Sequence, residues 1–232
     1  MNLLNSFSFE LPTKIEYGVG AARGLADVIK NLNATKVLVI TDKGVIPSGL
    51  LERITGPLEA HHLKWQVFDR VEPNPKDYNV KEGTEIARLF GPDCLVALGG
   101  GSPIDCAKAI AVVVRQGGAV RGYEGPHKIG ADVLPLIAIP TTAGTGSEVT
   151  FSSVITDSSE KFKFSIKDPR IAPKVALVDP EMTLTMPPEL TASTGMDALT
   201  HAIEGFTANA SEPIADSAAL YAIELITTYL RT

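Results

Sequence analysis

Short apolar runs rich in β-branched residues, separated by stretches with helical spacing, place the tightest constraint on the fold of this chain. The clearest are "KVLVIT" (36–41), "CLVALGGG" (94–101) and "VLPLIAIP" (133–140), with "KWQVFDRV" (64–71) and "VALVD" (175–179) as further candidates. Continuous apolar content is typical of strands in a parallel sheet that helices cover on both faces. The alternation therefore predicts an α/β fold built on a Rossmann-like parallel sheet domain.

The segments between these runs are expected to be helical. Residues 44–60 fit a helix that is interrupted near "TGP", and residues 76–90 carry apolar side chains at helical spacing. In the helix after "CLVALGGG", Ser102 is a plausible N-cap, Pro103 suits the first turn and Asp105 occupies the capping-box position. "FSSVITD" (151–157) and "KFKFSI" (161–166) add strand-like segments.

The pattern changes near residue 180. Residues 187–232 show two helical segments with no strand between them. We therefore expect a nucleotide-binding domain over 1–180 and the start of an all-helical domain over 181–232. A segment of about 50 residues is too small to bury a core of its own. We expect this helical domain to be incomplete and the chain to be truncated.

Composition excludes several classes of function. The net charge is −6 and Lys and Arg do not cluster, which argues against nucleic acid as a partner. The two cysteines, Cys94 and Cys106, lie in apolar surroundings, which fits unpaired thiols in a reducing compartment. The N-terminus lacks the pattern of a signal peptide, and the apolar runs are shorter than the ~20 residues that span a bilayer. We expect a cytoplasmic protein without a membrane partner.

The glycine turn in "GGGSPIDCAKA" is the first candidate for ligand binding. Gly99, Gly100 and Gly101 follow a strand and precede a helix, so the backbone there can approach a ligand closely. Free N–H groups at a helix N-terminus suit a pyrophosphate. The segment does not match the G-x-G-x-x-G fingerprint, and a glycine turn without a ligand explains it equally well.

The loop "PTTAGTGSEVT" (140–150) is the second candidate. The hydroxyl groups of four residues could bind a phosphate, a ribose or a carboxamide: Thr141, Thr142, Thr145 and Ser147. An ordinary Ser/Thr turn is the alternative. Because both loops follow buried strands, both are expected at the carboxyl edge of the sheet, where such folds bind ligands. Their joint presence favours a nucleotide.

Two further residues are candidates for the same crevice. Asp42 ends the first buried strand, where a carboxylate could accept hydrogen bonds from an adenosine ribose and repel a 2′-phosphate. An Asp that caps the following helix is the alternative. Asn74, in the proline turn "EPNPKD", could face the crevice, although a role in the turn is sufficient to explain it.

Asp197 and His201 lie four residues apart in "STGMDALTHAIEGF", so both side chains project from one face of a predicted helix. A carboxylate and an imidazole in this arrangement can hold a metal ion. A lone D-x-x-x-H pair is, however, usually solvated or at the edge of a core.

Taken in order, "GGGSPIDCAKA", "PTTAGTGSEVT", "PKVALVDPEMTLTMPP" and "STGMDALTHAIEGF" resemble the N-terminal portion of the iron-containing (group III) alcohol dehydrogenases. The resemblance runs from about Phe7 to the last residue. It implies an oxidoreductase that interconverts alcohols with aldehydes or ketones by hydride transfer to NAD(P). It also implies that 1–180 is an NAD(P)-binding domain and 181–232 an incomplete helical metal-binding domain.

The resemblance assigns roles to individual residues. Gly99, Gly100 and Ser102 would hold the pyrophosphate, while Thr141, Thr142 and Thr145 would line the dinucleotide. Ser147 and Val149 would reach towards the nicotinamide, and Lys163 would bind a ribose. Asp42 matches the family position that favours NAD over NADP, and Asp197 and His201 match two metal ligands. The resemblance implies no catalytic group beyond the metal site.

The metal site departs from the family pattern, whose ligands are one Asp and three His. The span from 202 to 232 contains neither His nor Cys. A bound Fe²⁺, or Zn²⁺ as the alternative, would act as a Lewis acid on the substrate oxygen during hydride transfer. With two ligands we expect weak metal binding and little or no activity for this chain alone.

Two alternatives remain open at this stage. One is a related enzyme, similar to glycerol dehydrogenases or to the dehydroquinate synthases, which are lyases that use NAD and Zn²⁺. The other is a non-catalytic nucleotide-binding fragment. A small alcohol or aldehyde is the expected substrate, and exposed apolar surface on the helices predicts association into a homo-oligomer such as a dimer.

Overall fold

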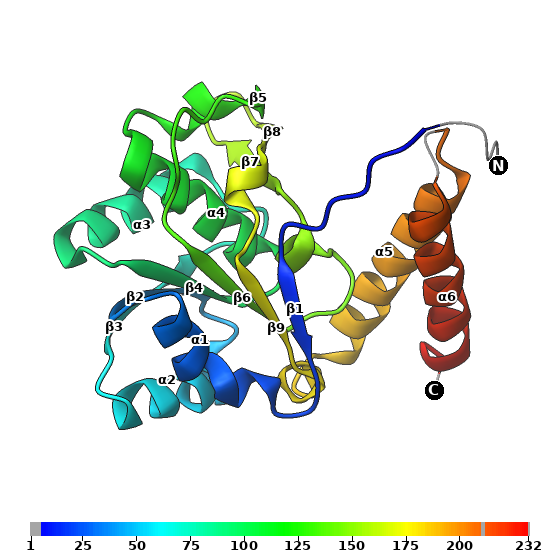
Figure 1. Ribbon diagram of the computed structural model, residues 1–232, viewed down its shortest axis with the longest axis horizontal. Helices are drawn as coiled ribbons and strands as arrows, with labels where there is room; N and C mark the ends of the chain where they lie inside the picture. The colour runs from blue at the N-terminus through cyan, green and yellow to red at the C-terminus, as the bar shows by residue number, and fades with distance from the viewer. Residues whose placement is uncertain (1–5, 210–211, 232) are drawn as a thin grey trace. The chain divides into compact units, whose positions relative to one another are not determined.

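The computed structural model describes residues 6–209 and 212–231 (Figure 1). Their contacts divide the chain into two compact units. The larger unit contains residues 12–141 and 147–185. The smaller unit contains residues 142–146 and the chain from 186 onward, together with N-terminal residues up to Leu11.

A six-stranded sheet, in which all neighbouring strands are parallel, forms the centre of the larger unit. Its strands lie in the order β1-β9-β6-β4-β2-β3. Their bounds are Lys14–Tyr17 for β1, Val175–Val178 for β9, Leu136–Pro140 for β6, Cys94–Gly99 for β4, Lys36–Asp42 for β2 and Lys64–Val71 for β3. The sheet confirms the predicted Rossmann-like α/β class.

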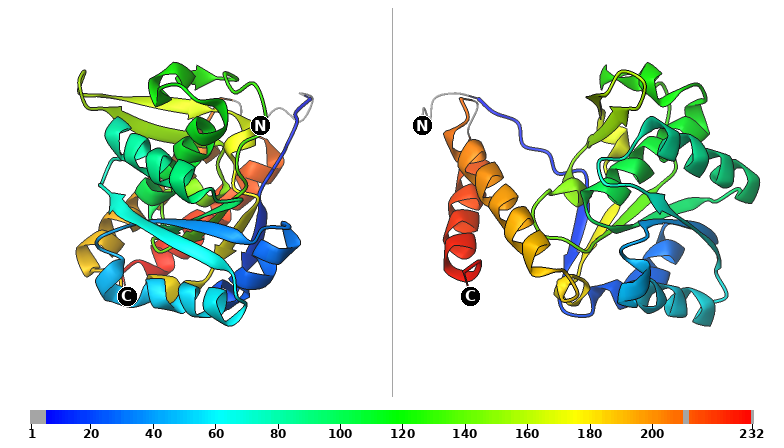
Figure 2. Two further views of the ribbon diagram at one scale, coloured as in Figure 1. Left: turned by 90° about the vertical axis from the view of Figure 1, so that its left-hand side faces the viewer. Right: turned by 180° about the vertical axis from the view of Figure 1, so that it is seen from behind.

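Helices cover both faces of this sheet (Figure 1, Figure 2). Because successive side chains of a strand point to opposite faces, each buried strand contributes to two separate cores. In β2, Leu38 and Ile40 join the core beneath α3 (Asp77–Phe90) and α4 (Gly101–Gln116). Val37 and Val39 join the core beneath α1 (Leu25–Asn31) and α2 (Leu50–Ala60). Burial on both sides explains the continuous apolar runs in the sequence.

A second, three-stranded sheet has the order β5-β8-β7. Its strands are β5 (Gly125–Pro126), β8 (Phe162–Lys167) and β7 (Ser152–Asp157), and β7 pairs antiparallel with β8. The guanidinium group of Arg121 lies 4.3 Å from the centre of the Phe162 ring and 4.9 Å from that of Phe164. The sequence indicates strands here but not a separate sheet.

Short 3-10 helices complete the larger unit. They are η1 (Ala21–Gly24), η2 (Ile46–Ser48), η3 (Val120–Tyr123), η4 (Ser147–Val149), η5 (Pro169–Ile171) and η6 (Pro180–Thr183). Several of them follow strand ends, and η4 carries two of the residues assigned to the nicotinamide.

Two details of the predicted helices are wrong. The helix over 44–60 is not interrupted at "TGP": α2 begins at Leu50 and continues through Pro57 to Ala60. Proline removes one hydrogen bond there, but Leu50, Ile54 and Leu58 are buried against the sheet and hold the helix in place. Ser102 is not the N-cap of α4, because the helix already begins at Gly101 and Gly100 occupies the capping position.

The smaller unit contains the two predicted helices, α5 (Pro188–Thr207) and α6 (Pro213–Tyr229). They pack closely, since a Cβ on Gly195 would overlap the side chain of Leu230. Few of their described residues are buried, namely Ala202, Asp216 and Ala219. Large apolar side chains are exposed instead, among them Met196, Ile203, Phe206, Leu220 and Leu225. The domain boundary near residue 180 stays a prediction.

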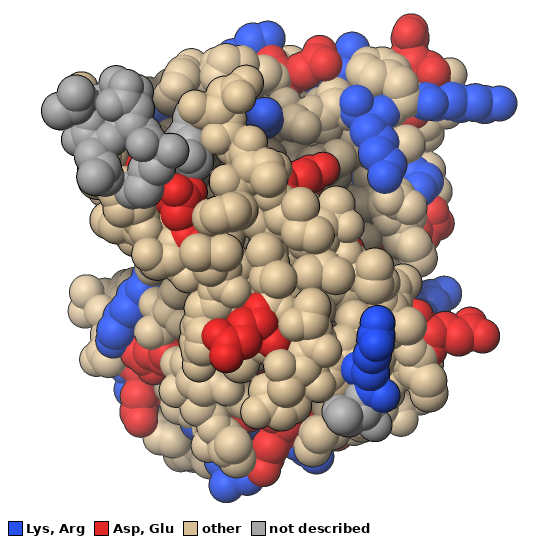
Figure 3. All heavy atoms as spheres, turned by 90° about the vertical axis from the view of Figure 1, so that its right-hand side faces the viewer, with Lys and Arg blue, Asp and Glu red and all other residues tan. Residues whose placement is uncertain are grey.

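Uncharged surface covers most of the face shown in Figure 3, and several Lys and Arg side chains lie near one another, together with acidic ones, in its upper right part. The whole sequence carries a net charge of −6. Among the helices that the structure describes, none combines the length and apolar character needed to cross a bilayer.

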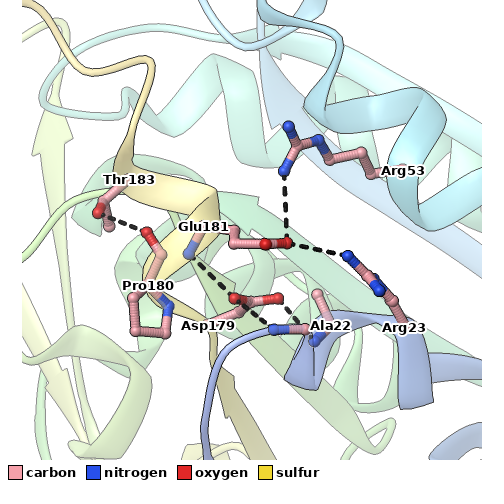
Figure 4. A network of polar contacts seen from close by, with 8 residues as sticks. Ala22, Arg23, Arg53, Asp179, Pro180, Glu181 and Thr183 are labelled. Carbon is pink, nitrogen blue, oxygen red and sulfur yellow. Dashed lines mark hydrogen bonds and ion pairs between the residues drawn. The ribbon is translucent and has the colours of Figure 1, made fainter.

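Asp179, directly after β9, joins the end of that strand to the turn and 3-10 helix η1 that follow the neighbouring strand β1, through one buried carboxylate (Figure 4). Its oxygens accept hydrogen bonds from the amides of Gly20 (3.0 Å), Ala22 (3.1 Å) and Glu181 (3.0 Å). Beside it, Glu181 forms an ion pair with Arg23 at 3.2 Å and lies 3.9 Å from Arg53. The Asp179 carboxylate thus satisfies three amides that would otherwise lack acceptors.

We expect Asp179→Ala to lower the free energy of unfolding by about 2–4 kcal/mol, because it leaves buried amides without an acceptor. Urea unfolding followed by circular dichroism measures the change. Arg23→Ala is the control: its side chain is 76% exposed, so losing its ion pair should cost less than about 1 kcal/mol. Equal effects of the two substitutions would contradict this account.

Candidate nucleotide site and metal ligands

The glycine turn and the threonine loop begin side by side. Strands β4 and β6 are parallel neighbours, and their last residues, Gly99 and Pro140, are partners in the register. The amide of Thr141 donates a hydrogen bond of 3.0 Å to the carbonyl of Gly99. Both segments therefore start at the carboxyl edge of the sheet, where parallel α/β folds bind ligands.

Gly99 is required by the conformation of the turn. Its φ is 148°, and a Cβ would lie 2.5 Å from the Cγ of Pro103. Gly100 then caps α4 without any side-chain hydrogen bond to the helix. The first amides of α4 have no side-chain cap, and this is the arrangement that suits a phosphate.

Asp42 lies beside this turn. Its Oδ1 accepts hydrogen bonds from the amides of Gly44 (2.8 Å) and Val45 (3.1 Å), which lie in the turn after β2. Neither η2 nor α2 has a side-chain cap, so the alternative prediction that Asp42 caps the following helix is wrong. Its Oδ2 lies 3.4 Å from the position that a Cβ of Gly99 would occupy. One carboxylate oxygen thus orders the turn after β2 while the other stays next to the glycine turn.

Three of the predicted cofactor residues form one hydrogen-bond network. The amide of Asn74 donates to the Ser102 hydroxyl at 3.1 Å, and Lys163 Nζ donates to Asn74 Oδ1 at 2.7 Å. Asn74 has a φ of 53°, a left-handed conformation that asparagine tolerates. The network joins the turn after β3, the first turn of α4 and strand β8. Sequence spacing alone does not show this proximity, because the residues are 28 and 89 positions apart.

Buried polar residues lie behind η4, which carries Ser147 and Val149. Asp105 is not part of a capping box: its Oδ2 accepts a hydrogen bond from the Val154 amide at 3.0 Å. Its Oδ1 lies 3.8 Å from the Nζ of Lys108, whose side chain is completely buried. The sequence patterns do not predict this cluster, although a lysine inside the apolar stretch "AKAIAVVV" is a signal for it.

The environment of the cluster shifts the pKa of each of its ionisable groups. Burial lowers the pKa of Lys108 to about 8, and Asp105 and Glu148 partly oppose that change. Burial raises the pKa of Asp105, against the effects of Lys108, the Val154 amide and Ser147. Burial also raises the pKa of Glu148. Opposite charges therefore partly compensate the cost of removing these groups from water.

The rest of the threonine loop belongs to the smaller unit, with Thr142 and Thr145 in the segment 142–146. This segment packs against α5, because a Cβ on Gly144 would overlap the carbonyl oxygen of Thr194. Thr142 Oγ1 is buried and has no hydrogen-bond partner among the described residues, so a ligand atom could use it. The sequence does not predict that the loop is divided in this way.

Asp197 and His201 lie on one face of α5, as their spacing predicts. Asp197 Oδ2 and His201 Nδ1 are 3.8 Å apart, and the side chains are 46% and 53% exposed. His201 Nδ1 is also 3.4 Å from the carbonyl oxygen of Gly144. Metal–ligand bonds of about 2.0–2.2 Å each allow one ion to bridge donors up to about 4 Å apart.

The two exposed side chains lie close enough to share a metal ion after a small rotation, and a carboxylate with an imidazole suits Fe²⁺ and Zn²⁺ alike. Within residues 6–209 and 212–231, no group of three or more His, Cys, Asp or Glu side chains could hold a metal ion. The pair is a partial donor set.

A parallel sheet with a glycine turn at its carboxyl edge defines a Rossmann-like nucleotide-binding architecture. Comparison with known proteins gives the family. The model of the family "Iron-containing alcohol dehydrogenase" matches residues 12–180. The model "Fe-containing alcohol dehydrogenase family, C-terminal" matches residues 191–232. The chain belongs to the iron-containing alcohol dehydrogenase family.

Individual relatives agree with this assignment. A choline dehydrogenase of Bacillus subtilis is 42% identical over 97% of this chain and 56% of its own length. An NAD-dependent methanol dehydrogenase of Bacillus methanolicus is 40% identical over 96% of this chain and 58% of its own length. The chain thus spans little more than half the length of the curated relatives it matches.

Solved structures show the same fold. A 1,3-propanediol oxidoreductase superimposes with a TM-score of 0.95 at 38% identity, covering 98% of this chain and 59% of its own. A sulfoacetaldehyde reductase of Bifidobacterium kashiwanohense in complex with NAD+ gives a TM-score of 0.90 at 37% identity, covering 97% of this chain and 60% of its own.

Proposed function

We propose that this chain supplies the NAD-binding part of a metal-assisted alcohol dehydrogenase, which interconverts a small alcohol with an aldehyde or ketone. The observation that carries the proposal is the glycine turn at Gly99 and Gly100, which opens α4 beside the start of the threonine loop. Family membership supplies the reaction class. The named relatives act on different alcohols and aldehydes, so the proposal extends to the class of substrate and not to one compound.

Each cofactor residue takes a role that its position supports. Gly99, Gly100 and Ser102, at the start of α4, hold the pyrophosphate through backbone amides and one hydroxyl. Asn74 lies next to Ser102, Lys163 lies next to Asn74, and the two bind a ribose. The remaining residues line the dinucleotide towards its nicotinamide end: Thr141, Thr142, Thr145, Ser147 and Val149. On this basis residues 1–180 form the cofactor domain and residues 181–232 the first part of the helical metal-binding domain.

Asp42 makes NAD the preferred cofactor over NADP. Its Oδ2 lies beside the glycine turn, and a carboxylate there accepts hydrogen bonds from a ribose and repels a 2′-phosphate. We expect Asp42→Asn to lower the ratio of the NADPH and NADH dissociation constants by about 10-fold, because it removes one close charge repulsion. Asparagine keeps an oxygen that can accept from Gly44 and Val45. Fluorescence titration with both cofactors measures the ratio.

Asp132→Asn is the control for Asp42→Asn, since Asp132 is an exposed acid in a loop of the same unit. It changes net charge by the same amount and should leave the ratio unchanged. If both substitutions shift the ratio equally, the discrimination comes from overall charge and not from Asp42.

Asp197 and His201 would hold Fe²⁺, with Zn²⁺ as the alternative, as two members of a larger ligand set. The metal, when bound, supplies a Lewis acid that polarises the carbonyl or acidifies the alcohol of the substrate. The protein contributes the position of the two donors on one face of α5. With these two donors, the 232-residue chain should bind metal weakly and turn over alcohols poorly.

The competing candidate is a nucleotide-binding fragment without catalytic activity. It predicts that NAD binds without turnover and without stoichiometric metal, even when downstream ligands are present. A reaction like that of glycerol dehydrogenases or dehydroquinate synthases is the other alternative. Metal analysis with an NADH-linked assay, on this chain and on any longer gene product, tests all three. A longer product that binds NAD but neither metal nor alcohols would overturn the dehydrogenase proposal.

We also propose a cytoplasmic homo-oligomer, with a dimer as the simplest form. The free thiols of Cys94 and Cys106 are both buried, which suits a reducing compartment. The exposed apolar side chains of α5 and α6, such as Ile203, Leu220 and Leu225, favour association. Sedimentation velocity over a range of concentrations measures the state, and a monomer throughout would contradict the expectation.

A further inference from the structure

The proposed cofactor site leaves one buried charge unexplained. Lys108 lies in the middle of α4, and its side chain is 0% exposed. Its Nζ donates hydrogen bonds to Thr150 Oγ1 at 3.0 Å and to the carbonyl of Ser152 at 2.7 Å. A lysine that is fully buried is costly unless it is paired and hydrogen-bonded. Both acceptors lie on the chain that follows η4.

Asp105, one turn earlier on α4, binds the same segment from its other end. Its Oδ2 accepts from the Val154 amide at 3.0 Å, and its carbonyl accepts from the Ser153 hydroxyl at 2.8 Å. Its Oδ1 lies 3.8 Å from Lys108 Nζ. Two residues of one helix thus hold residues 150–154 through four hydrogen bonds and share one ion pair.

The contacts continue to Ser147 itself. The Thr150 hydroxyl accepts from Lys108 and lies 3.5 Å from the carbonyl of Ser147, to which it donates. The amide of Thr150 donates to the same carbonyl at 3.4 Å, which closes the turn of η4. A rotation of the Thr150 side chain would therefore disturb η4 directly.

The Asp105–Lys108 cluster lies between the two ends of the proposed site, the pyrophosphate-binding start of α4 and the nicotinamide-binding segment at η4. Gly100 and Ser102, at the start of α4, are the proposed pyrophosphate contacts, and Asp105 and Lys108 follow on the next two turns. Ser147 and Val149, at the nicotinamide end, lie on the segment that these two residues hold. Well-packed apolar residues could fill the same volume with similar or greater stability. We therefore interpret the ionic cluster as a feature that fixes the position of the segment after η4 relative to α4, and not as a source of stability.

We propose that the buried Asp105–Lys108 pair is a positioning element that fixes the nicotinamide-binding segment, residues 147–152, relative to the pyrophosphate-binding start of α4. The inference rests on the proposed NAD-binding function. Neither residue needs to touch the cofactor. Their effect passes through Thr150 and Ser152 to the backbone of η4, which presents Ser147 and Val149.

The test compares two ligands that share the ADP-ribose portion. NADH engages both ends of the site, whereas ADP-ribose lacks the nicotinamide. Dissociation constants for each are measured by calorimetry on the 232-residue chain and its variants. For Lys108→Met we expect a loss of about 10-fold or more for NADH and of less than about 3-fold for ADP-ribose.

Two variants of Thr150 keep the test valid if Lys108→Met does not fold. Thr150→Val removes the hydroxyl between Lys108 and Ser147 without changing charge or size, and should weaken NADH binding by about 3–10-fold. Thr150→Ser keeps the hydroxyl and should bind both ligands normally. If Lys108→Met does not fold, the valine and serine variants decide the question alone.

Equal losses for NADH and ADP-ribose, or no loss for either, would show that the cluster is only structural and would overturn the inference. A different failure is distinguishable from these. If the unaltered chain binds neither ligand, the proposed NAD-binding function is wrong and the positioning role falls with it.

Discussion

Alanine at position 99 is expected to abolish NADH binding by this chain. The φ of Gly99 is 148°, and the added Cβ would lie 2.5 Å from the Cγ of Pro103. Relief of that overlap must displace either the turn or the first residues of α4, whose amides are the proposed pyrophosphate contacts. Loss of several charge-assisted hydrogen bonds corresponds to a fall in affinity of about 100-fold or more. Fluorescence titration with NADH measures it.

Gly122→Ala serves as the matched control for Gly99→Ala. Gly122 lies in η3, and nothing lies within 4 Å of the position of an added Cβ. This variant should bind NADH like the unaltered chain. Circular dichroism should show that both variants are folded. Normal NADH binding by the Gly99 variant would remove the glycine turn from the cofactor site.

Lys108 is expected to contribute a rise in the free energy of unfolding between about pH 8 and pH 10, against the opposite effect of the buried thiols. Burial lowers its pKa from 10.5 to about 8 in the folded chain. Between these pH values the unfolded state binds the proton and the folded state does not, so the free energy of unfolding rises with pH. Over about 2.5 pH units the contribution approaches about 3 kcal/mol. It is lost again as the pH falls towards 8.

Lys108→Met should remove this rise. The comparison is between variants, because burial also raises the pKa of Cys94 to about 12, and buried thiols lower the stability above their ordinary pKa of 9.0. That effect is common to all the variants and cancels. Lys81→Met, at an exposed position of α3, is the control and should keep the rise. Urea unfolding at intervals from pH 7.5 to about pH 10 measures the slopes, and parallel curves for the two variants would refute the assignment.

The main sheet could be predicted from the sequence because its signals are local. Strands such as β4 are buried on both faces and are therefore apolar throughout, while the intervening helices repeat at their own period. The three-stranded sheet could not be predicted in the same way. Its formation depends on pairing between β5 and β8, which are about 40 residues apart.

In the candidate site, too, residues with a local sequence signal could be predicted, whereas residues defined by contacts distant in the sequence could not. Gly99, Asp42 and the threonine loop could be recognised because each follows a strand and has a distinctive residue type. The role of Lys163 came from the family resemblance, whereas Asn74 was a candidate because of its place in the proline turn. The structure adds the 2.7 Å hydrogen bond that joins them. Lys108 was missed because its acceptors lie 42 and 44 residues later in the chain. A local pattern carries no information about such contacts.

Titration of the purified 232-residue chain with NADH and with NADPH, without added metal, tests whether this chain binds a dinucleotide and prefers NAD to NADP. We expect saturable binding of one NADH per chain and binding of NADPH that is weaker by about 10-fold or more. A folded chain that binds neither nucleotide, or binds NADPH as tightly as NADH, would contradict this expectation.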